Sequence, residues 1–372
     1  MAARMGFAVS VLLIAASHVL GKSIYQYDLT TGETTLVSDN APDGMAATAI
    51  SGDIVTWFEG GSIYAKNVKL GTGPVLITTT AETAGQVAPA IDGDIIVWSD
   101  RRAGGQDSDI YGYRLSTGKE FPVCINSAGY QTQYRPSISG NIVVWNDGRG
   151  GTTDVWGKNL TTDEEFPVSV RPSAEYWPDM CGNMVVWVSK GQGTHGPINE
   201  IWARDLSDPD GIPYLLYHSD TVVFRAVVGD GLVAWQELMG AERDIDIRAL
   251  DLESGQILDI TTEPGNQKYP SITGRRIVWE DLANGAISDL YGVDILPSHG
   301  YANPIAASTT VLEDRYFIAA GRSSSLFPEV DGNTVIWQDF AIGTGAIPEP
   351  GSVIMGAAFL GVGWYARRRR MT

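Results

Sequence analysis

Charged side chains follow the same kind of short apolar segment at several points of this 372-residue chain. Asp100, Arg101 and Arg102 come shortly after Trp98, and Asp147 and Arg149 come shortly after Trp145. Carboxylates and guanidinium groups can hydrogen-bond the hydroxyl and carboxyl groups of sugars, or they can pair with each other and order their own loops. From sequence alone both interpretations stay open.

A second set of candidate binding residues combines aromatic rings with one more arginine. These residues precede a proline or occupy a similar place in the repeat described below, and they are Tyr134, Arg135, Tyr176, Trp177, Phe224, Tyr269 and Phe327. Aromatic faces beside charged groups suit sugar rings, which stack on the ring and hydrogen-bond at their edges. The alternative is that these rings only fill the protein interior.

Other motifs give little support for catalysis or metal binding. No two of His195, His218 and His299 have the spacing of zinc ligands, and the Asp pairs 107/109 and 208/210 lack the ligand run of a calcium loop. The glycine-rich segment 191–196 joins two predicted strands and opens no helix, so it is not a dinucleotide site. We therefore expect no metal, no cofactor and no catalytic residue.

An internal repeat positions the candidate residues. Seven segments end in tryptophan, at intervals between 41 and 58 residues, and the mean interval of about 47 lies in the range of one four-stranded propeller blade. They end at Trp57, Trp98, Trp145, Trp187, Trp235, Trp279 and Trp337. Each unit reads as a strand, a glycine turn, the apolar tryptophan strand, a third strand such as DIYGYRL and a fourth such as EFPVC.

The two ends of the repeat region complete one another. Residues 23–38 read as a third and fourth strand with no tryptophan strand before them, and residues 328–340 read as a first and second strand with none after them. Pairing these halves predicts an all-β, seven-bladed propeller of four-stranded antiparallel blades over residues 22–346, without exposed sheet edges at the joint. Residues 297–326 are interpreted as a long connection between blades.

The repeat units resemble TolB-like propeller repeats. The resemblance rests on a hydrophobic second strand followed by a loop with Asp, Gly and Arg and then a D-[IL]-Y strand, best seen in residues 100–113 and 146–158. It covers nearly all of residues 22–340 and implies a fold rather than a function. The best-known members of that family have six blades, whereas seven are expected here.

Both ends of the chain read as targeting segments. Residues 1–21 carry Arg4 and a ten-residue apolar core, Phe7–Ala16, which predicts a signal peptide cleaved by signal peptidase. Residues 347–372 resemble a PEP-CTERM sorting signal because they combine Pro348, Glu349 and Pro350, an apolar span (351–366) and Arg367, Arg368, Arg369 and Arg370. The resemblance implies processing by an exosortase in a Gram-negative bacterium that makes exopolysaccharide, with a single transmembrane helix as the anchor until then. An ordinary tail anchor is the alternative.

Charge and cysteine content narrow the partners further. Without both terminal segments the chain keeps 21 of its 26 basic and 43 of its 44 acidic residues, a net charge of −22. Such a surface repels phosphate backbones, so no nucleic-acid partner is expected. Cys124 and Cys181 belong to different blades at different radii, and we expect two free thiols.

These observations favour an exported, non-catalytic binding module at the cell surface or in the extracellular matrix. Loops after the second strands and between blades are expected on one face, where they bring the candidate residues together. The expected partner is exopolysaccharide or another envelope protein. The competing hypothesis is a propeller-type polysaccharide lyase or glycosidase that uses carboxylates on that face, and ice binding, suggested by the tail alone, is a third.

Overall fold

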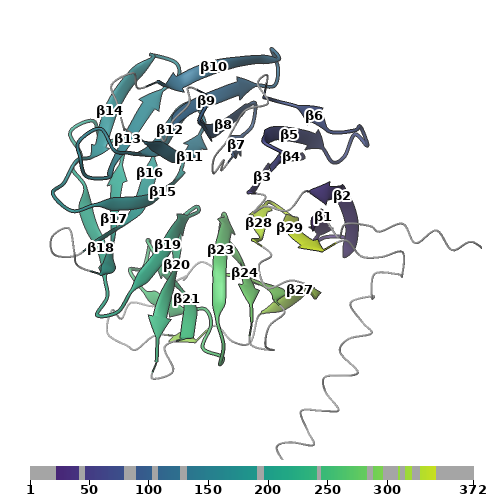
Figure 1. Cartoon of the computed structure of the whole chain (residues 1–372). Coiled ribbons are helices and arrows are strands. Elements are labelled where there is room, and N and C mark those ends of the chain that lie inside the picture. The colour runs from purple at the N-terminus through teal and green to yellow at the C-terminus, as the bar shows by residue number, and fades with distance from the viewer. Residues whose placement is uncertain are drawn as a thin grey trace, which may run out of the picture.

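The computed structural model describes residues 22–41, 47–78, 89–102, 108–125, 132–190, 197–240, 244–282, 288–295, 309–310, 315–320 and 327–340. Every regular element in these residues is a β-strand, and the strands form seven sheets arranged in a ring (Figure 1). The predicted seven-bladed propeller is confirmed. The predicted signal peptide and sorting tail lie outside the described residues. No helix within the described ranges is long and apolar enough to cross a membrane.

Blades are numbered here by the order of their tryptophan strands, and each is given from the inner strand outward. Blade 1 consists of β3 (Thr48–Ser51), β4 (Ile54–Glu59), β5 (Ser62–Asn67) and β6 (Val75–Leu76). Blade 2 consists of β7 (Ala90–Asp92), β8 (Ile95–Asp100), β9 (Asp109–Arg114) and β10 (Lys119–Cys124). Blade 3 consists of β11 (Gln133–Ser139), β12 (Ile142–Asp147), β13 (Asp154–Asn159) and β14 (Glu164–Ser169).

The next three blades follow the same order. Blade 4 consists of β15 (Glu175–Cys181), β16 (Met184–Lys190), β17 (Ile198–Asp205) and β18 (Tyr214–His218). Blade 5 consists of β19 (Val223–Val228), β20 (Leu232–Met239), β21 (Asp244–Asp251), β22 (Ile257–Asp259) and a fifth strand, β26 (Thr309–Thr310). Blade 6 consists of β23 (Gln267–Thr273), β24 (Arg276–Asp281), β25 (Asp289–Asp294) and β27 (Tyr316–Ala320).

Blade 7 joins the two ends of the chain, as the sequence predicts. Its inner strands are β28 (Glu329–Asp331) and β29 (Thr334–Phe340), and its outer strands are β1 (Lys22–Asp28) and β2 (Glu33–Ala41). The pairing of β1 with β29 is antiparallel and runs without a break, with Tyr25 opposite Trp337 and Gln26 opposite Ile336. In Figure 1 the purple strands of the N-terminus lie beside the yellow strands of the C-terminus, which closes the ring.

The interpretation of residues 297–326 as a blade connection alone was wrong. Within this range β27 is the outer strand of blade 6, and β26 pairs in parallel with β22 and adds a fifth strand to blade 5. Neither segment carries the EFPV pattern of the outer strands β10 and β14. Both strands cover backbone groups that would otherwise form an open sheet edge, which is the physical reason that the chain returns to these blades.

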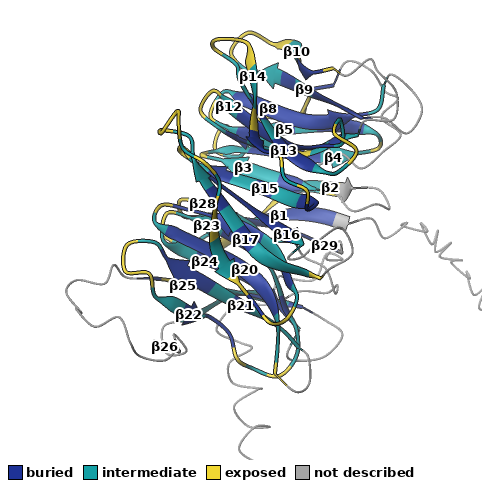
Figure 2. Ribbon diagram, turned by 90° about the vertical axis from the view of Figure 1, so that its left-hand side faces the viewer, coloured by how far each residue is buried: buried dark blue, intermediate teal, exposed yellow. Residues whose placement is uncertain are grey.

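The core lies between neighbouring blades rather than within one layer. Six of the repeated tryptophans have no exposed surface, and Trp337 is 4% exposed. Each packs against apolar residues of its own and of a neighbouring blade, as Trp57 does with Ile24 and Ile336. Dark-blue buried strands accordingly fill the middle of the stacked blades in Figure 2. The tryptophans are therefore structural, and they are not exposed for stacking with a ligand.

The turns between first and second strands connect the blades around the ring. Gly140 and Gly182 have φ values of 58° and 58°, in the left-handed region that favours glycine. Their N–H groups donate to Asp92 and Ser139 of the preceding blade, at 2.5 and 3.0 Å. The same bond closes the ring between Gly52 and Asp331. This face of the disc therefore consists of short, cross-linked turns.

The two cysteines are free, as predicted. Cys124 ends the outer strand β10, and Cys181 ends the inner strand β15 two blades further on. Burial raises the pKa of both thiols, to about 12 for Cys124. Neither thiol is therefore activated as a nucleophile.

Candidate functional site

Strand pairing places the long loops and the starts of the inner strands on one face. Gln133, the first residue of β11, pairs with Asp147 at the end of β12, whereas the turn glycine Gly140 lies at the other end of the same hairpin. The backbone bond from Leu160 N–H to the Asn141 carbonyl, at 2.8 Å, places the turn after the third strand beside the short glycine turn. The candidate residues thus lie on the face opposite the glycine turns.

The Asp–Arg loops form ordered internal networks. Asp100 accepts hydrogen bonds from the Trp98 indole at 2.9 Å and from the Arg102 guanidinium, and Arg102 also pairs with Glu120. The guanidinium of Arg102 lies 3.8 Å from the ring centroid of Tyr111. Burial raises the pKa of Asp100, but the bonds from Arg102 and Trp98 outweigh it, so this pKa lies below its ordinary value.

Blade 3 repeats this arrangement. Asp147 accepts from the Trp145 indole at 2.9 Å and from Arg149 at 2.7 Å, and Arg149 also pairs with Glu165 at 3.0 Å. The Asp100 and Asp147 side chains have no exposed surface, and their arginines already have carboxylate partners. These four residues therefore hold the loops in place, and Arg101 beside them is only partly exposed. Nothing in this geometry aims them at a ligand.

The second candidate set contributes to a constellation around the central axis. Four residues at the matching position of their blades have positive φ although they are not glycine: Arg135 (54°), Trp177 (52°), Tyr269 (53°) and Phe327 (46°). Each stands directly before a proline within or just before an inner strand, a position in which the right-handed helical region is disfavoured. A left-handed backbone at bulky residues stores strain of about 1–3 kcal/mol each, and such strain concentrates at functional sites.

A bulge and a hydrogen bond keep these residues in their strained conformation. The register of β11 shifts between Tyr134 and Ser137, and the same shift recurs in β15, β19 and β23. The N–H groups of the strained residues donate to the residue that follows the tryptophan of the preceding blade. The bonds are Arg135 to Ser99 at 3.2 Å, Trp177 to Asn146 at 3.0 Å, Tyr269 to Gln236 at 3.0 Å and Phe327 to Glu280 at 3.4 Å.

Blade 5 supplies a fifth member that the sequence analysis missed. Arg225 occupies the position of Arg135 and Trp177. Ala226 lies opposite Trp235, at the place where the other blades have their proline, and Arg225 is the residue directly before it. The predicted residue Phe224 lies one step earlier and matches Tyr134 and Tyr176, which are partly buried behind the strained positions. Aligning the blades at the bulge, instead of searching for proline, would have identified Arg225. We call Arg135, Trp177, Arg225, Tyr269 and Phe327 the mouth ring.

Members of the mouth ring contact each other between blades. The Arg135 guanidinium lies 5.7 Å from the ring centroid of Trp177, and the rings of Tyr269 and Phe327 are 4.4 Å apart. Arg225 of blade 5 forms an ion pair at 3.1 Å with Glu329 of blade 7, which links two inner strands on either side of blade 6. The mouth ring is therefore a single constellation of three aromatic rings and two guanidinium groups.

Two carboxylates lie deeper along the inner strands. Glu329 accepts from the Ser271 hydroxyl at 2.9 Å in addition to Arg225. Asp179 accepts from the Val228 N–H at 2.9 Å and from the Ser137 hydroxyl at 3.1 Å. Burial raises the pKa of Asp179, against the opposing effects of the Val228 N–H and Arg225.

Arg135 differs electrostatically from the other arginines of the site. Arg135 is an exposed residue, and no carboxylate pairs with it among the residues that the structure describes. Surrounding protein atoms nevertheless replace part of the water around its guanidinium group. This desolvation and then the repulsion from Arg225 lower the pKa of Arg135. A cation held in this way is stabilised by an incoming anion.

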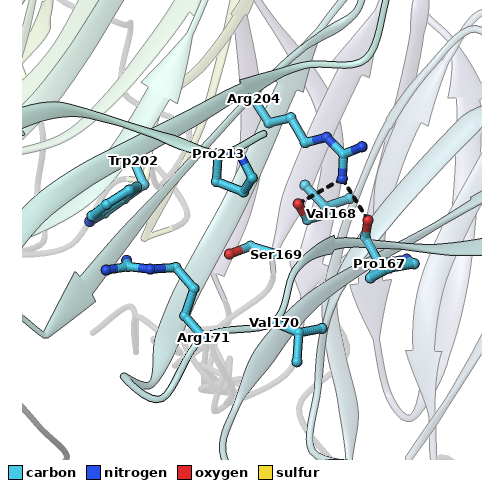
Figure 3. Close-up of a pocket in the computed structure, with 8 residues that line it drawn as sticks. All are labelled: Pro167, Val168, Ser169, Val170, Arg171, Trp202, Arg204 and Pro213. Carbon is cyan, nitrogen blue, oxygen red and sulfur yellow. Dashed lines mark hydrogen bonds between the residues drawn. The ribbon is translucent and has the colours of Figure 1, made fainter. Parts of the chain in front are cut away.

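A pocket of about 410 Å³ lies elsewhere, on the outer rim between blades 3 and 4. Its walls come from β14, the segment that follows it, β17 and Pro213 (Figure 3). Arg204 donates to the carbonyls of Pro167 and Val168, and the guanidinium of Arg171 lies 3.4 Å from the ring centroid of Trp202. Both arginines are thus held by neighbouring residues, and the pocket is separate from the mouth ring.

No metal centre is found in the parts of the chain that the structure describes, since no three His, Cys, Asp or Glu side chains gather there. His218 is exposed, while His195 and His299 lie outside the described ranges. The Asp208/Asp210 pair forms a local turn, in which the Asp210 N–H donates to Asp208 at 3.0 Å.

Comparisons with known proteins agree on the fold. By sequence the chain matches no established protein-family profile, and it matches no curated protein. It resembles a solved structure assigned as TolB from Agrobacterium tumefaciens, with 12% identity, a TM-score of 0.51 and coverage of 87% of this chain and 99% of that one. It also resembles an oligogalacturonate lyase in complex with manganese, with 15% identity, a TM-score of 0.54 and coverage of 74% and 82%.

A third similar structure is an oligogalacturonate lyase from Vibrio parahaemolyticus, with 12% identity, a TM-score of 0.52 and coverage of 74% of this chain and 84% of that one. At such identities the similarity extends to the fold and not to the activity. The chain is thus a propeller with the TolB-like architecture, which it shares with TolB and with oligogalacturonate lyases.

Proposed function

We propose that this chain is an exported, non-catalytic propeller that binds polysaccharide through its mouth ring at the cell surface or in the extracellular matrix. The observation that carries the proposal is the strained backbone of four mouth-ring residues, which presents one arginine and three aromatic rings around one axis. Strain at matching positions of four blades has no advantage for packing, because glycine would adopt the same backbone without cost. Binding is its simplest explanation.

The chemistry of the mouth ring suits sugars. Trp177, Tyr269 and Phe327 are partly exposed and offer flat apolar faces to pyranose rings. Arg135 and Arg225 offer several N–H donors in fixed planes to hydroxyl and carboxyl oxygens. The strongly negative surface elsewhere disfavours nucleic acid as an alternative ligand.

Binding should be measured between the full-length chain in mild detergent and exopolysaccharide purified from the bacterium that makes this protein. Trp177→Ala and Tyr269→Ala are each expected to weaken binding about tenfold or more, as expected for central aromatic anchors. Tyr214→Ala is the matched control, because Tyr214 is 42% exposed on the outer strand β18 and far from the axis. Loss of binding in the control alone, or retention in all variants, would argue against the mouth ring.

An envelope protein is the other partner that the sequence suggests. Cross-linking the intact chain in living cells distinguishes it from a glycan. Capture of one protein through mouth-ring positions, together with no binding of any polysaccharide, would replace the glycan proposal.

The route to the cell surface rests on the two terminal segments. The proposal includes removal of residues 1–21 by signal peptidase, transient anchoring by the C-terminal helix and sorting of the tail by an exosortase. Replacing the arginines 367–370 by glutamine should cause the protein to accumulate unsorted in the inner membrane, as detected by cell fractionation. Unchanged sorting of this variant would contradict the PEP-CTERM assignment.

A lyase or glycosidase remains the second candidate, because Asp179 and Glu329 lie beside Arg225 on the inner strands and burial raises the pKa of Asp179. A carboxylate of raised pKa can act as a general base at neutral pH. In a lyase it would take the C5 proton of a uronate, the bond from C4 to the leaving oxygen would break, and a C4–C5 double bond would form while the leaving oxygen gains a proton. Unsaturated products that vanish in Asp179→Asn would establish this reaction.

A further inference from the structure

The charges of the mouth ring point to a particular class of glycan, an inference that rests on the proposed function. Arg225 is neutralised by Glu329 at 3.1 Å, and Glu280 is engaged with the Ser288 hydroxyl at 2.7 Å and the Phe327 N–H. Arg135 has no carboxylate partner in the described part of the chain. The site therefore holds one guanidinium group whose charge is not compensated.

The unpaired guanidinium group favours an anionic ligand, whereas the net negative charge of the chain disfavours a ligand with many negative charges. The chain carries a net charge of −18, so a dense polyanion meets long-range repulsion before it reaches the mouth ring. At an ionic strength of about 0.15 M this repulsion decays over roughly 8 Å, whereas a direct contact with Arg135 is screened much less. A ligand with isolated acidic groups satisfies both conditions, and a uniformly charged polymer does not.

The aromatic rings add a second requirement. Trp177 lies directly beside Arg135, and the Tyr269–Phe327 pair lies at other blades of the same ring. When an acidic sugar contacts Arg135, the adjoining sugars of the same glycan therefore contact aromatic faces and no further unpaired cation of the mouth ring. Neutral pyranose rings suit these faces, because stacking needs no charge.

We propose that the mouth ring selects a mainly neutral glycan that carries an isolated carboxylate-bearing sugar, and that Arg135 binds this carboxylate. Trp177, Tyr269 and Phe327 stack with the neutral sugars on either side. Arg225 keeps its pair with Glu329 and positions the site without being the primary anion-binding group. A sulfate on the same sugar presents similar chemistry, and the experiment separates the two anions.

The test compares matched oligosaccharides on the full-length chain by titration calorimetry. One is a repeat unit of neutral sugars with a single uronate, a second is the same molecule with its carboxyl reduced to an alcohol, and a third carries a sulfate in its place. A fourth consists of uronates alone. The single-uronate compound is expected to bind about tenfold or more tightly than both its reduced form and the all-uronate compound.

Variants assign this preference to one residue. Arg135→Gln should bring the single-uronate and reduced compounds to within about twofold of each other, while Arg135→Lys retains part of the preference. Arg114→Gln is the control, since Arg114 is partly exposed at the end of β9 and pairs with Asp94 at 3.5 Å away from the mouth ring. Thermal unfolding of each variant shows whether the fold is intact.

The outcomes separate this inference from the proposed function. Equal binding of the uronate and reduced compounds by the unaltered chain overturns the acidic-sugar inference and leaves glycan binding in place. Tighter binding of the all-uronate compound also overturns it. If none of the oligosaccharides binds while the protein is folded, the proposed function itself fails. A preference for the sulfated compound that depends on Arg135 identifies sulfate as the anion.

Discussion

Tyr25 and Trp337 are paired directly across β1 and β29, and their rings stack with centroids 5.7 Å apart. These residues stand near opposite ends of the chain, so one contact between strands fixes both ends. Ile24 beside Tyr25 is fully buried against Trp57 and Ile336, which belong to the first and last blades. The stability of the ring therefore depends on its N-terminal strand.

Ile24→Ala should destabilise the whole propeller. Removing a fully buried side chain of this size costs about 2–5 kcal/mol, and the loss opens the joint between blades 7 and 1. Denaturant unfolding should shift as one transition, reported equally by tryptophan fluorescence and circular dichroism. Leu36→Ala on β2, where the side chain is 49% exposed, is the control and should shift stability by about 0.5 kcal/mol or less. A deletion of residues 23–38 that melts like the intact chain would disprove the closure.

Asp100→Asn should destabilise the protein at neutral pH. The carboxylate accepts bonds from Trp98 and Arg102 in a buried site, and replacing it leaves the guanidinium only partly compensated, at a cost of about 1–3 kcal/mol. Because the folded pKa of Asp100 lies below its unfolded value, this contribution is present above pH ~4 and is lost as the pH falls through the folded pKa. Chemical denaturation between neutral and acidic pH measures the difference.

The control for that substitution is Asp163→Asn. The Asp163 side chain is 87% exposed in its pair with Lys158, and such surface pairs contribute little. A loss in Asp100→Asn no larger than in this control would show that the Trp–Asp–Arg network does not stabilise its loop.

Glu175→Gln should stabilise the protein at slightly alkaline pH. Burial raises the pKa of Glu175 to about 7, despite the bond from Ser169 at 2.6 Å and the charge of Arg171. The folded state therefore holds a proton that the unfolded state releases near pH ~4.3, and the free energy of unfolding falls as the pH rises from there to about 7. This fall in the free energy of unfolding amounts to about 3 kcal/mol at most. Glutamine carries no ionisable proton, so the variant does not show this fall.

This pH dependence distinguishes Glu175 from an ordinary surface carboxylate. Unfolding curves of the unaltered chain and of Glu175→Gln should converge near pH 4 and diverge toward pH ~8. Parallel curves across that range would mean that the pKa of Glu175 is the same in the folded and the unfolded protein.

Trp177→Gly should be more stable than Trp177→Ala, although both remove the same ring. At φ 52° an alanine keeps the penalty of the left-handed region, whereas glycine does not, and the difference should be about 1 kcal/mol in favour of glycine. The same pair of substitutions at Tyr176, which lacks a positive φ, should favour alanine. Both Trp177 variants should also lose glycan binding. Equal stability of the two would show that the backbone there is not strained.

Local pattern was sufficient to predict most of the strands. The tryptophan segments, the glycine turns and the D-[IV]-[YW]-G strands each follow from residue type and spacing, because the same short strands recur from blade to blade. The strand β27 was missed because it follows β25 after a long segment. A signal for it exists: Gly292 lies opposite Tyr316 as Gly112 and Gly157 lie opposite Phe121 and Phe166, with the aromatic ring covering the glycine.

The sequence by itself determined the number of blades, the closure of the ring and the face on which the loops gather, because these depend on repeat length and strand alternation. Only the tertiary structure showed that Asp100 and Asp147 face inward toward tryptophan and arginine, and that Arg225 of blade 5 reaches Glu329 of blade 7, 104 residues away. It also showed that Arg135 stands without a carboxylate partner among the described residues. The physical reason is that strand alternation fixes which side of the sheet a side chain occupies, whereas the curvature of the closed ring decides which inner strands of different blades come close together.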